Sequence, residues 1–238
     1  MKKKHEAPLV YANYKRIAKK IVAVLKKEQR DTDRIALLDW GGHDGVLSQL
    51  LIKKGIKHIT LYDVGDSLPH FDYDRFPDLR QVKPVYSNET VAMPFDDRQF
   101  DVILSVGVLE HVPFMGDSLK ELHRILKNDG LLFVFHFPNR FSWTEWLASW
   151  HQLSGHARKL TARELYLQLV THGYDVVSQW RFNFLPKTLY PLPAVILHMM
   201  SIFTPIVYFF DFFLSRIPLL NQLANSNECY AKAKHVLR

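Results

Sequence analysis

A glycine-rich segment that follows an apolar run contains the residues best suited to hold a ligand. It reads Asp39-Trp40-Gly41-Gly42-His43-Asp44-Gly45 and comes directly after the apolar run 35–39. Glycines permit a tight turn and a close approach of backbone to a ligand, and the first amides of the next helix then face that ligand. Asp63 ends the next apolar run, 18 residues after Gly45, where an acidic side chain can accept both hydroxyls of a ribose. The spacing favours a ribose-containing cofactor over a tight turn that is merely followed by an acidic surface residue.

Three histidines are candidates for a general base. His111, His136 and His156 are expected near the carboxyl ends of predicted strands, and imidazole titrates near neutral pH. Taken alone, each of them is more often structural than catalytic, because position and not residue type identifies a base. For Glu110 and His111, helix capping or structural hydrogen bonding stays open beside a catalytic role. Cys229 is the single cysteine, so an intrachain disulfide and a multi-cysteine zinc site are excluded, and no metal site is expected.

Short apolar runs alternate with helical patterns over most of the chain. Strands are predicted at 35–39, 59–63, 82–86, 100–106, 131–137 and 175–182, and helices at 46–54, 117–127 and 162–172. Thr161 and Glu164 have the spacing of a capping box for the last helix. Strands that are apolar on both faces and separated by helices indicate a parallel sheet covered on both sides. We therefore expect an α/β, Rossmann-like doubly wound sheet, mostly parallel, with 228–235 as an antiparallel last strand at an edge.

These motifs resemble those of the class I S-adenosylmethionine-dependent methyltransferases, particularly the small-molecule group that includes the quinone-biosynthesis enzymes. The resemblance covers about 35–182. Residues 37–45 are similar to the family's hydrophobic stretch followed by Asp-x-Gly-x-Gly-x-Gly, with His43 in place of the middle glycine. Residues 93–103 match its Leu-Pro-Phe, turn, Phe-Asp-Val stretch and are the most specific similarity. Further similarities lie at 105–112, 126–130, 137–140 and 156–161.

The resemblance implies S-adenosylmethionine as cofactor and assigns residues to its parts. Glu89 stands where the family binds the adenine amino group, and the backbone near Val106 would line the methionine part. The implied cofactor-binding set is Asp39, Gly41, Gly42, Gly45, Asp63, Val64, Glu89, Thr90, Ser105 and Val106. A sulfonium methyl is already activated for in-line displacement, so the protein has chiefly to align the acceptor in a dry site.

Positive charge is concentrated at the N-terminus. The net charge is +7; residues 1–30 hold ten Lys or Arg against Glu6 and Glu28, a balance of +8, and the remainder is at −1. This distribution, and the lack of an Asn-Pro-Pro-aromatic motif, argue against a nucleic-acid substrate. Apolar residues at three- and four-residue steps predict an amphipathic helix over 8–29, which either packs on the main domain or contacts a membrane surface.

The segment 192–214 is almost entirely apolar. Its 23 residues match the length of a membrane span, but Pro193, Pro205 and Asp211 favour two shorter helices divided near Thr204 and Pro205. The alternatives are a transmembrane span, a lipid-binding or membrane-dipping cap, and a buried subdomain or homodimer face. We expect a basic helix at 1–30, a cofactor-binding core at 31–182, a hydrophobic helical insertion at 183–227 and the final edge strand at 228–238.

A methyltransferase acting on a hydrophobic or lipid-like small molecule is therefore the function that the sequence favours. The insertion should rise at the carboxyl edge of the sheet, beside the methyl donor. A cytoplasmic location with peripheral membrane contact follows from the absence of a secretory signal and from the basic N-terminus. The alternatives are a soluble sugar or natural-product methyltransferase with a dimerising insertion, and a non-catalytic cofactor-binding or membrane-scaffolding module.

Overall fold

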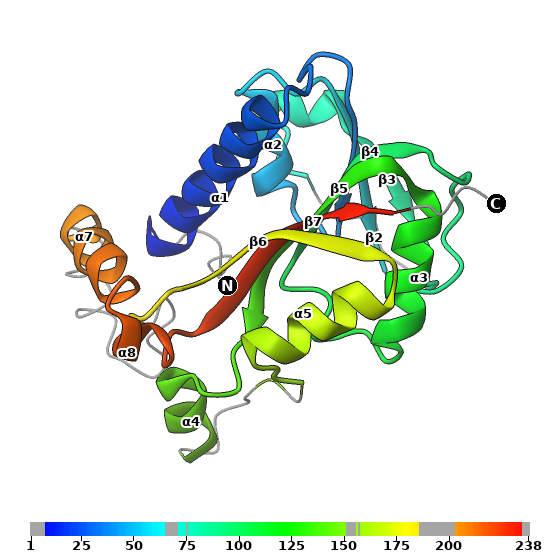
Figure 1. Cartoon of the computed structure of the whole chain (residues 1–238). Coiled ribbons are helices and arrows are strands. Elements are labelled where there is room, and N and C mark those ends of the chain that lie inside the picture. The colour runs from blue at the N-terminus through cyan, green and yellow to red at the C-terminus, as the bar shows by residue number, and fades with distance from the viewer. Residues whose placement is uncertain are drawn as a thin grey trace.

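One mixed sheet forms the centre of the protein, as shown by a computed structural model that describes residues 8–64, 71–74, 76–150, 156, 158–185 and 203–234. Within these ranges the sheet has seven strands in the order β3-β2-β1-β4-β5-β7-β6 (Figure 1). The strands are β1 (Ala36–Trp40), β2 (His58–Asp63), β3 (Lys83–Tyr86), β4 (Phe100–Val106), β5 (Leu126–Pro138), β6 (Tyr174–Phe182) and β7 (Ser226–Ala233). Strands β1 to β5 pair in parallel, and β7 is antiparallel to β5 and β6. The Rossmann-like, mostly parallel fold is confirmed.

The last strand is not at an edge, so that part of the prediction was wrong. Strand β7 lies between β5 and β6, with Ala231 paired to Leu132 on one side and to Val176 on the other. It begins at Ser226, two residues before the predicted start. Nearly all of β7 is buried, whereas β6 is half-exposed and takes the edge position. The alternation of residue types predicted the strand, but it carries no information about which neighbours a strand acquires.

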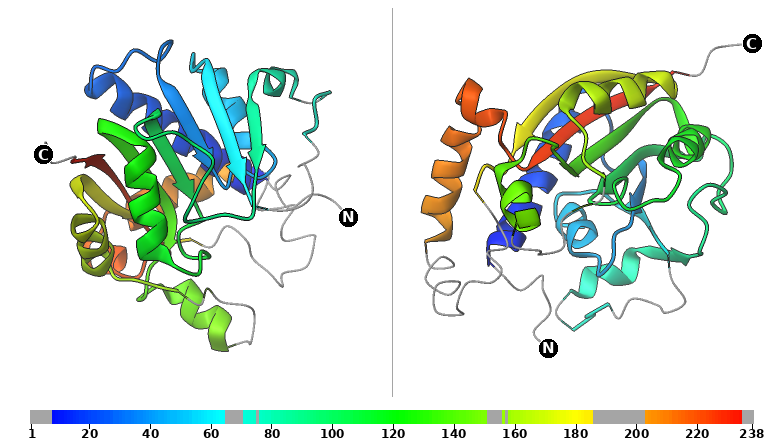
Figure 2. Two further views of the ribbon diagram at one scale, coloured as in Figure 1. Left: turned by 90° about the vertical axis from the view of Figure 1, so that its right-hand side faces the viewer. Right: turned by 90° about the horizontal axis from the view of Figure 1, so that it is seen from below.

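Helices cover both faces of the sheet, as the apolar strands require. Helices α1 (Pro8–Lys27) and α2 (Val46–Ile52) lie on one face, and α3 (Met115–Ile125) and α5 (Ala162–Thr171) on the other (Figure 2). A short 3₁₀ helix, η2 (Pro77–Gln81), contacts α2. The capping box is confirmed: Thr161 Oγ1 accepts the Glu164 N–H at 3.2 Å, and Glu164 Oε2 accepts the Thr161 N–H at 2.7 Å.

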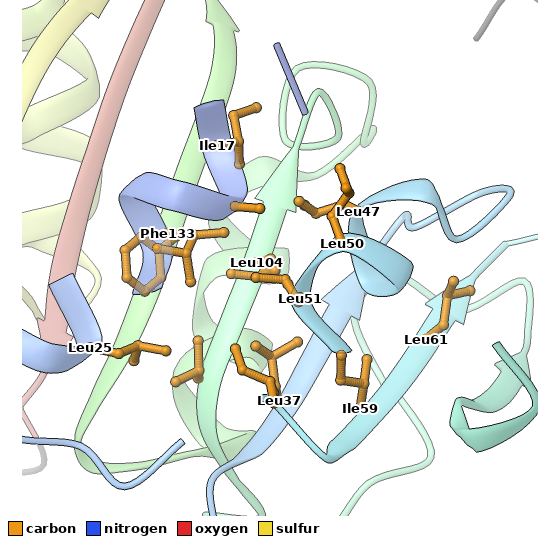
Figure 3. Close-up of a cluster of buried hydrophobic side chains, with 14 of the residues drawn as sticks. Ile17, Leu25, Leu37, Leu47, Leu50, Leu51, Ile59, Leu61, Leu104 and Phe133 are labelled. Atoms are coloured by element: carbon orange, nitrogen blue, oxygen red, sulfur yellow. The ribbon is translucent and has the colours of Figure 1, made fainter. Parts of the chain in front are cut away.

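The amphipathic helix α1 is part of the main core. Its buried Ile17 and Leu25 pack with Leu50 and Leu51 of α2 and with strand residues such as Leu104 (Figure 3). Removing these side chains from water supplies most of the free energy that holds α1 on the sheet. The prediction that this helix packs on the domain is confirmed, while membrane contact by its lysines stays a prediction.

Three short helices gather at the end of the sheet where the ligand-binding edge is expected: α4 (Trp143–Trp150), α7 (Thr204–Leu214) and α8 (Pro218–Asn221) (Figure 1). Strand β6 runs in the same direction as β1 to β5, so the chain that follows it leaves at their carboxyl edge. Of the apolar segment, only 203–214 lies within the described residues. Helix α7 begins at Thr204, in agreement with the predicted division. No helix in the described ranges has both the length and the apolar character needed to cross a membrane.

Candidate active site

The glycine-rich loop joins β1 to α2 at the carboxyl edge of the sheet. Gly41 has φ of 71° and donates its N–H to the Tyr62 carbonyl at 2.7 Å; Gly45 has φ of 75° at the cap of α2. A Cβ on Gly41 would lie 2.3 Å from Val108 Cγ2, and one on Gly45 would lie 2.9 Å from Leu79 Cδ2. Both positions therefore need glycine for the backbone angle and for packing against neighbouring side chains.

His43 replaces the middle glycine of the motif without opening the loop. Its φ is 47°, in the left-handed region that glycine adopts most easily, and its side chain is exposed. Its N–H donates to Asp63 Oδ2 at 2.8 Å. The histidine therefore follows the conformation expected of a glycine at this position.

The Asp63 carboxylate connects the end of β2 to the glycine-rich loop through a hydrogen bond. Its Oδ2 accepts the N–H of His43 and its Oδ1 accepts the N–H of Val64, each at 2.8 Å. A carboxylate has about four lone-pair sites, so both oxygens retain the capacity to accept a hydroxyl. The carboxylate is thus held at the carboxyl end of β2 with free acceptor capacity, as a ribose contact requires.

Asp39 lies behind the loop. Its carboxylate is buried and accepts the Ser48 hydroxyl at 2.6 Å, which fixes the start of α2. Burial raises the pKa of Asp39 to about 6, and the nearby carboxylates of Asp63 and Asp44 act in the same direction, against the lowering effect of the Ser48 bond. A direct contact of Asp39 with the cofactor stays a prediction.

The remaining predicted cofactor residues line up along the same edge. Trp40 pairs with Tyr62 of β2 and Ser105 of β4, which brings the ends of these strands together. The exposed Glu89 is held through its backbone, because its carbonyl accepts the Tyr62 hydroxyl. Ser105 Oγ is buried, with no hydrogen-bond partner among the described residues. Such orphan groups are rare in proteins, and this one fits an edge built to bind a polar ligand.

A cluster of titratable groups forms beyond the end of β4. His111 and His156 have ring centroids 5.4 Å apart, and His111 Nε2 lies 3.8 Å from Glu110 Oε1. Glu145 of α4 holds His156 from the other side, with Oε1 at 2.9 Å from Nδ1 and Oε2 accepting the His156 N–H at 3.2 Å. Arg158 donates to the carbonyls of Leu109 and Pro113 at 3.1 Å each and thereby fixes the turn that carries the cluster.

The surroundings of these three groups shift their pKa values in different directions. Burial raises the pKa of Glu110 to about 7, and its Oε2 has no partner among the described residues. The hydrogen bond to Glu145 raises the pKa of His156, whereas burial and the neighbouring His156 lower that of His111. A neutral imidazole at position 111 is suited to accept a proton, and the protonated form is favoured at 156.

The same cluster could also hold a metal ion. Ligand atoms of Glu110, His111 and His156 lie within 4.8 Å of one another. Carboxylate and imidazole are ordinary ligands of divalent transition metals. The expectation of no metal site therefore stays a prediction, and this cluster is the place to test it.

His136 does not join the other two histidines. It lies near the end of β5 with φ of 62°, and its Nε2 is hydrogen-bonded to the Asn13 side-chain amide of α1. Asn13 is buried and in turn accepts the Arg16 Nε–H at 3.0 Å. The structure therefore assigns His136 to the contact between α1 and the sheet, and its role as a base is not supported by proximity to the cluster.

Sequence reasoning missed three residues at this edge: Asn13, Tyr14 and Glu145. Burial raises the pKa of Tyr14 to about 12, and the carboxylates of Asp44 and Asp39 in the glycine-rich segment act in the same direction. The buried amide on the apolar side of a helix was the available signal for Asn13. No local pattern marks Glu145, because its partner His156 lies eleven residues away in the sequence.

Residues 93–103, the stretch most similar to the family's motifs, connect β4 with neighbouring elements through ring packing and a hydrogen bond. Phe95 packs edge-on against Tyr62 and Phe100, at centroid distances of 5.4 and 5.0 Å. The Met93 N–H donates to Glu121 Oε1 of α3 at 2.7 Å. Residues 93–103 therefore fix α3 and β4 relative to the crevice.

Comparison with known proteins decides the family. A family model described as a methyltransferase domain matches residues 10–179, which is more than half of the chain. The chain belongs to this methyltransferase family. Together with the fold, this membership identifies it as a class I S-adenosylmethionine-dependent methyltransferase and implies that compound as methyl donor.

Individual curated relatives match only part of the chain and at low sequence identity. The ubiquinone/menaquinone biosynthesis C-methyltransferase UbiE of Chromobacterium violaceum is 32% identical over 103 residues, 42% of either chain. A ubiquinone biosynthesis O-methyltransferase of Pelagibacter ubique is 26% identical over 111 residues, 46% of this chain and 45% of the relative. The chain thus matches less than half the length of these curated relatives. The crystal structure of a putative sarcosine dimethylglycine methyltransferase from Galdieria sulphuraria has a TM-score of 0.61 at 12% identity, covering 92% of this methyltransferase and 86% of that chain, which shows the shared fold.

Proposed function

We propose that this protein transfers a methyl group from S-adenosylmethionine to a hydrophobic or lipid-like small molecule encountered at a membrane surface. The proposal rests on the kinds of side chain that lie together at the carboxyl edge of the sheet. There, the polar cluster around His111 includes Glu145 of α4, a helix that exposes large apolar side chains. Trp146 and Trp150 of α4 are both more than 60% exposed, and their rings lie 5.1 Å apart.

The residues that fit the donor are those of the glycine-rich loop, Asp63, Glu89 and Ser105. The donor supplies an electrophilic methyl group on a sulfonium, so no covalent enzyme intermediate is required. Asp63 would bind the ribose hydroxyls and Glu89 the adenine amino group. The loop between β1 and α2 would hold the remainder through backbone amides.

The acceptor side relies on the cluster beyond β4. If the acceptor is a hydroxyl, the neutral imidazole of His111 would take its proton, and Glu110 would stabilise the imidazolium that forms 3.8 Å away. The ion pair with Glu145 would keep His156 charged beside it. Apolar side chains on α4 would exclude water from the reacting atoms and prefer an apolar acceptor.

The direct test of the acceptor is a product survey. Lipid and metabolite extracts are incubated with the protein and donor carrying an isotopically labelled methyl group, and labelled products are found by mass spectrometry. Label in an apolar, extractable product supports the proposal. Label confined to a sugar or another water-soluble product contradicts it.

Donor binding is tested separately with Asp63→Ala and titration calorimetry of the demethylated product, S-adenosylhomocysteine. Hydrogen bonds to a charged group contribute about 1.5–3 kcal/mol each, so loss of even one ribose contact weakens binding by about tenfold or more, and methyl transfer should be abolished. The matched control is Asp33→Ala, an exposed carboxylate before β1 at the opposite edge, which pairs with Lys57. Equal affinity of the two variants would refute the assignment of Asp63.

His111→Ala tests the proton acceptor. For a hydroxyl acceptor we expect kcat to fall by about a hundredfold or more with KM of the donor unchanged, because general-base catalysis contributes 10²–10⁴-fold. The same substitution at His136, His136→Ala, is the comparison, since that histidine contacts Asn13 and lies apart from the cluster. An equal effect of the two substitutions on kcat would exclude His111 as the base.

A further inference from the structure

A cavity whose lining contains none of the residues assigned to the methyl donor opens between α1, β6 and α7. It has a volume of about 830 Å³. Arg16 and Lys20 come from α1, Arg181 from β6, and Arg216 directly follows α7. Helix α7 stands beside α1 and the end of β6 (Figure 1). Nothing in the proposed methyl transfer uses these side chains.

The cavity carries an excess of positive charge. Arg16 is neutralised by the fully buried Glu228, to which it donates at 2.8 and 2.6 Å. Lys20, Arg181 and Arg216 form no ion pair with any residue in the described part of the chain. Lys20 and Arg216 lie against the rings of Trp180 and Phe212, but a ring does not neutralise a full charge. Cations that lack a carboxylate partner within the described ranges therefore repel one another around this cavity, and an anion placed among them would remove that repulsion.

Two buried polar atoms of the cavity lining also lack partners. Arg181 Nη1 is fixed by Asn221 Oδ1 at 3.0 Å, but Arg181 Nε has no acceptor among the described residues. Ser215 is 96% buried, and its hydroxyl has no partner there either. A guanidinium edge and a hydroxyl together are a common arrangement for binding phosphate oxygens. The donors without an acceptor and the cations without a carboxylate partner therefore both favour an anionic ligand such as a phosphate.

The mouth of the cavity is apolar. Phe209 and Phe212 line it and are exposed, and Arg216 lies 3.3 Å above the Phe212 ring centroid. Beyond the mouth, the same helix exposes more than half of Ile206, Phe210 and Phe213. The carboxylate on this helix, Asp211, is buried and accepts the Leu185 N–H at 2.7 Å. The outer face of α7 is thus aromatic and uncharged next to a basic pocket, which is the distribution found where helices lie in a membrane interface.

We propose that this cavity binds the phosphate headgroup of an anionic phospholipid while the aromatic face of α7 lies in the acyl boundary of the bilayer. Lys20, Arg181 and Arg216 contact the phosphate, and Ser215 donates a hydrogen bond to it. The inference rests on the part of the proposed function that places the protein at a membrane, and it names the surface responsible. It makes the carboxyl edge of the sheet, where the acceptor is methylated, face the bilayer.

The test is flotation of the full chain with vesicles, in the absence of methyl donor. We expect binding to vesicles of phosphatidylcholine with 30 mol% phosphatidylglycerol, about tenfold stronger than to phosphatidylcholine alone. The Lys20→Glu/Arg216→Glu variant should lose about tenfold or more in partition. The matched control, Lys53→Glu/Lys54→Glu, makes the same charge change at exposed positions after α2 and should lose less than threefold. Equal losses in the two double variants would overturn the proposal in favour of general charge attraction.

Three further measurements test the role of α7 and distinguish a phospholipid from other ligands of this surface. Phe209→Ser/Phe213→Ser should weaken flotation while circular dichroism stays unchanged; full binding by this variant would overturn the role of α7. Calorimetry with soluble glycerol phosphate should show binding at least a hundredfold weaker than to vesicles, and tight binding would instead assign the cavity to a free phosphate ester. A stable wild-type dimer by light scattering that Phe209→Ser/Phe213→Ser dissociates would assign the face to a second copy. Because flotation contains no donor or acceptor, its failure is distinguishable from failure of the proposed methyl transfer.

Discussion

Replacing Glu110 with glutamine should remove a loss of folding stability that the wild-type protein undergoes as pH rises from 4.5 to about 7. The Glu110 side chain is 98% buried, and burial raises its pKa from 4.5 to about 7. Each pKa unit corresponds to 1.36 kcal/mol, so ionisation of this group costs the folded state about 3 kcal/mol relative to the unfolded chain. The folded state binds the proton more tightly, and stability therefore falls as pH rises from 4.5 to about 7.

The assay is urea denaturation of wild type and Glu110→Gln at intervals from pH 4.5 to 8.5. Any packing cost of the amide is independent of pH and cancels when the difference in unfolding free energy is followed across the series. That difference should move by about 3 kcal/mol in favour of the variant as pH increases. Asp96→Asn, at an exposed carboxylate, controls for the removal of one surface charge. Parallel stability curves for wild type and Glu110→Gln would refute the reasoning.

Two other substitutions test the packing that supports the site. Gly45→Ala should lower the unfolding free energy by about 1–3 kcal/mol in thermal denaturation, because the alanine would have a positive φ and its Cβ would lie 2.9 Å from Leu79 Cδ2. Gly55→Ala is the control: its φ is 95°, but its Cβ would meet only Thr32 Oγ1 at an ordinary 3.9 Å, so it should lower the unfolding free energy less. Equal losses would contradict the packing argument. Arg16→Ala should lower the unfolding free energy by about 3–5 kcal/mol, because it leaves the Glu228 carboxylate buried without its partner. Adding Glu228→Gln to the same chain should recover part of that loss. No recovery would show that Arg16 stabilises the protein through packing alone.

The cofactor edge was largely predictable from sequence because its parts are local. The loop 39–45 follows its strand directly, and Asp63 ends the next one. In a parallel sheet the carboxyl ends of adjacent strands must meet, so the chain order alone brings these residues to one edge. The hydrogen bond between the His43 N–H and Asp63 agrees with that expectation.

The acceptor cluster was predictable only in part. His111 and His156 were both candidates, but residue type could not show that they meet or that His136 lies elsewhere. Their meeting depends on contacts made by residues that follow β5: Arg158 donates to the Leu109 carbonyl, and Glu145 is hydrogen-bonded to His156. Contacts of this kind have no period that a sequence pattern can reveal.

By itself the sequence determined the parallel α/β sheet, the glycine-rich turn and the acidic residue that faces it, because hydrophobic periodicity and backbone requirements act over neighbouring residues. Only the tertiary structure decided that β7 lies between β5 and β6, and that Lys20, Arg181 and Arg216 surround one cavity. Those outcomes depend on which distant surfaces bury each other, and the order of strands and the meeting of side chains from α1, β6 and α7 are set by that non-local packing.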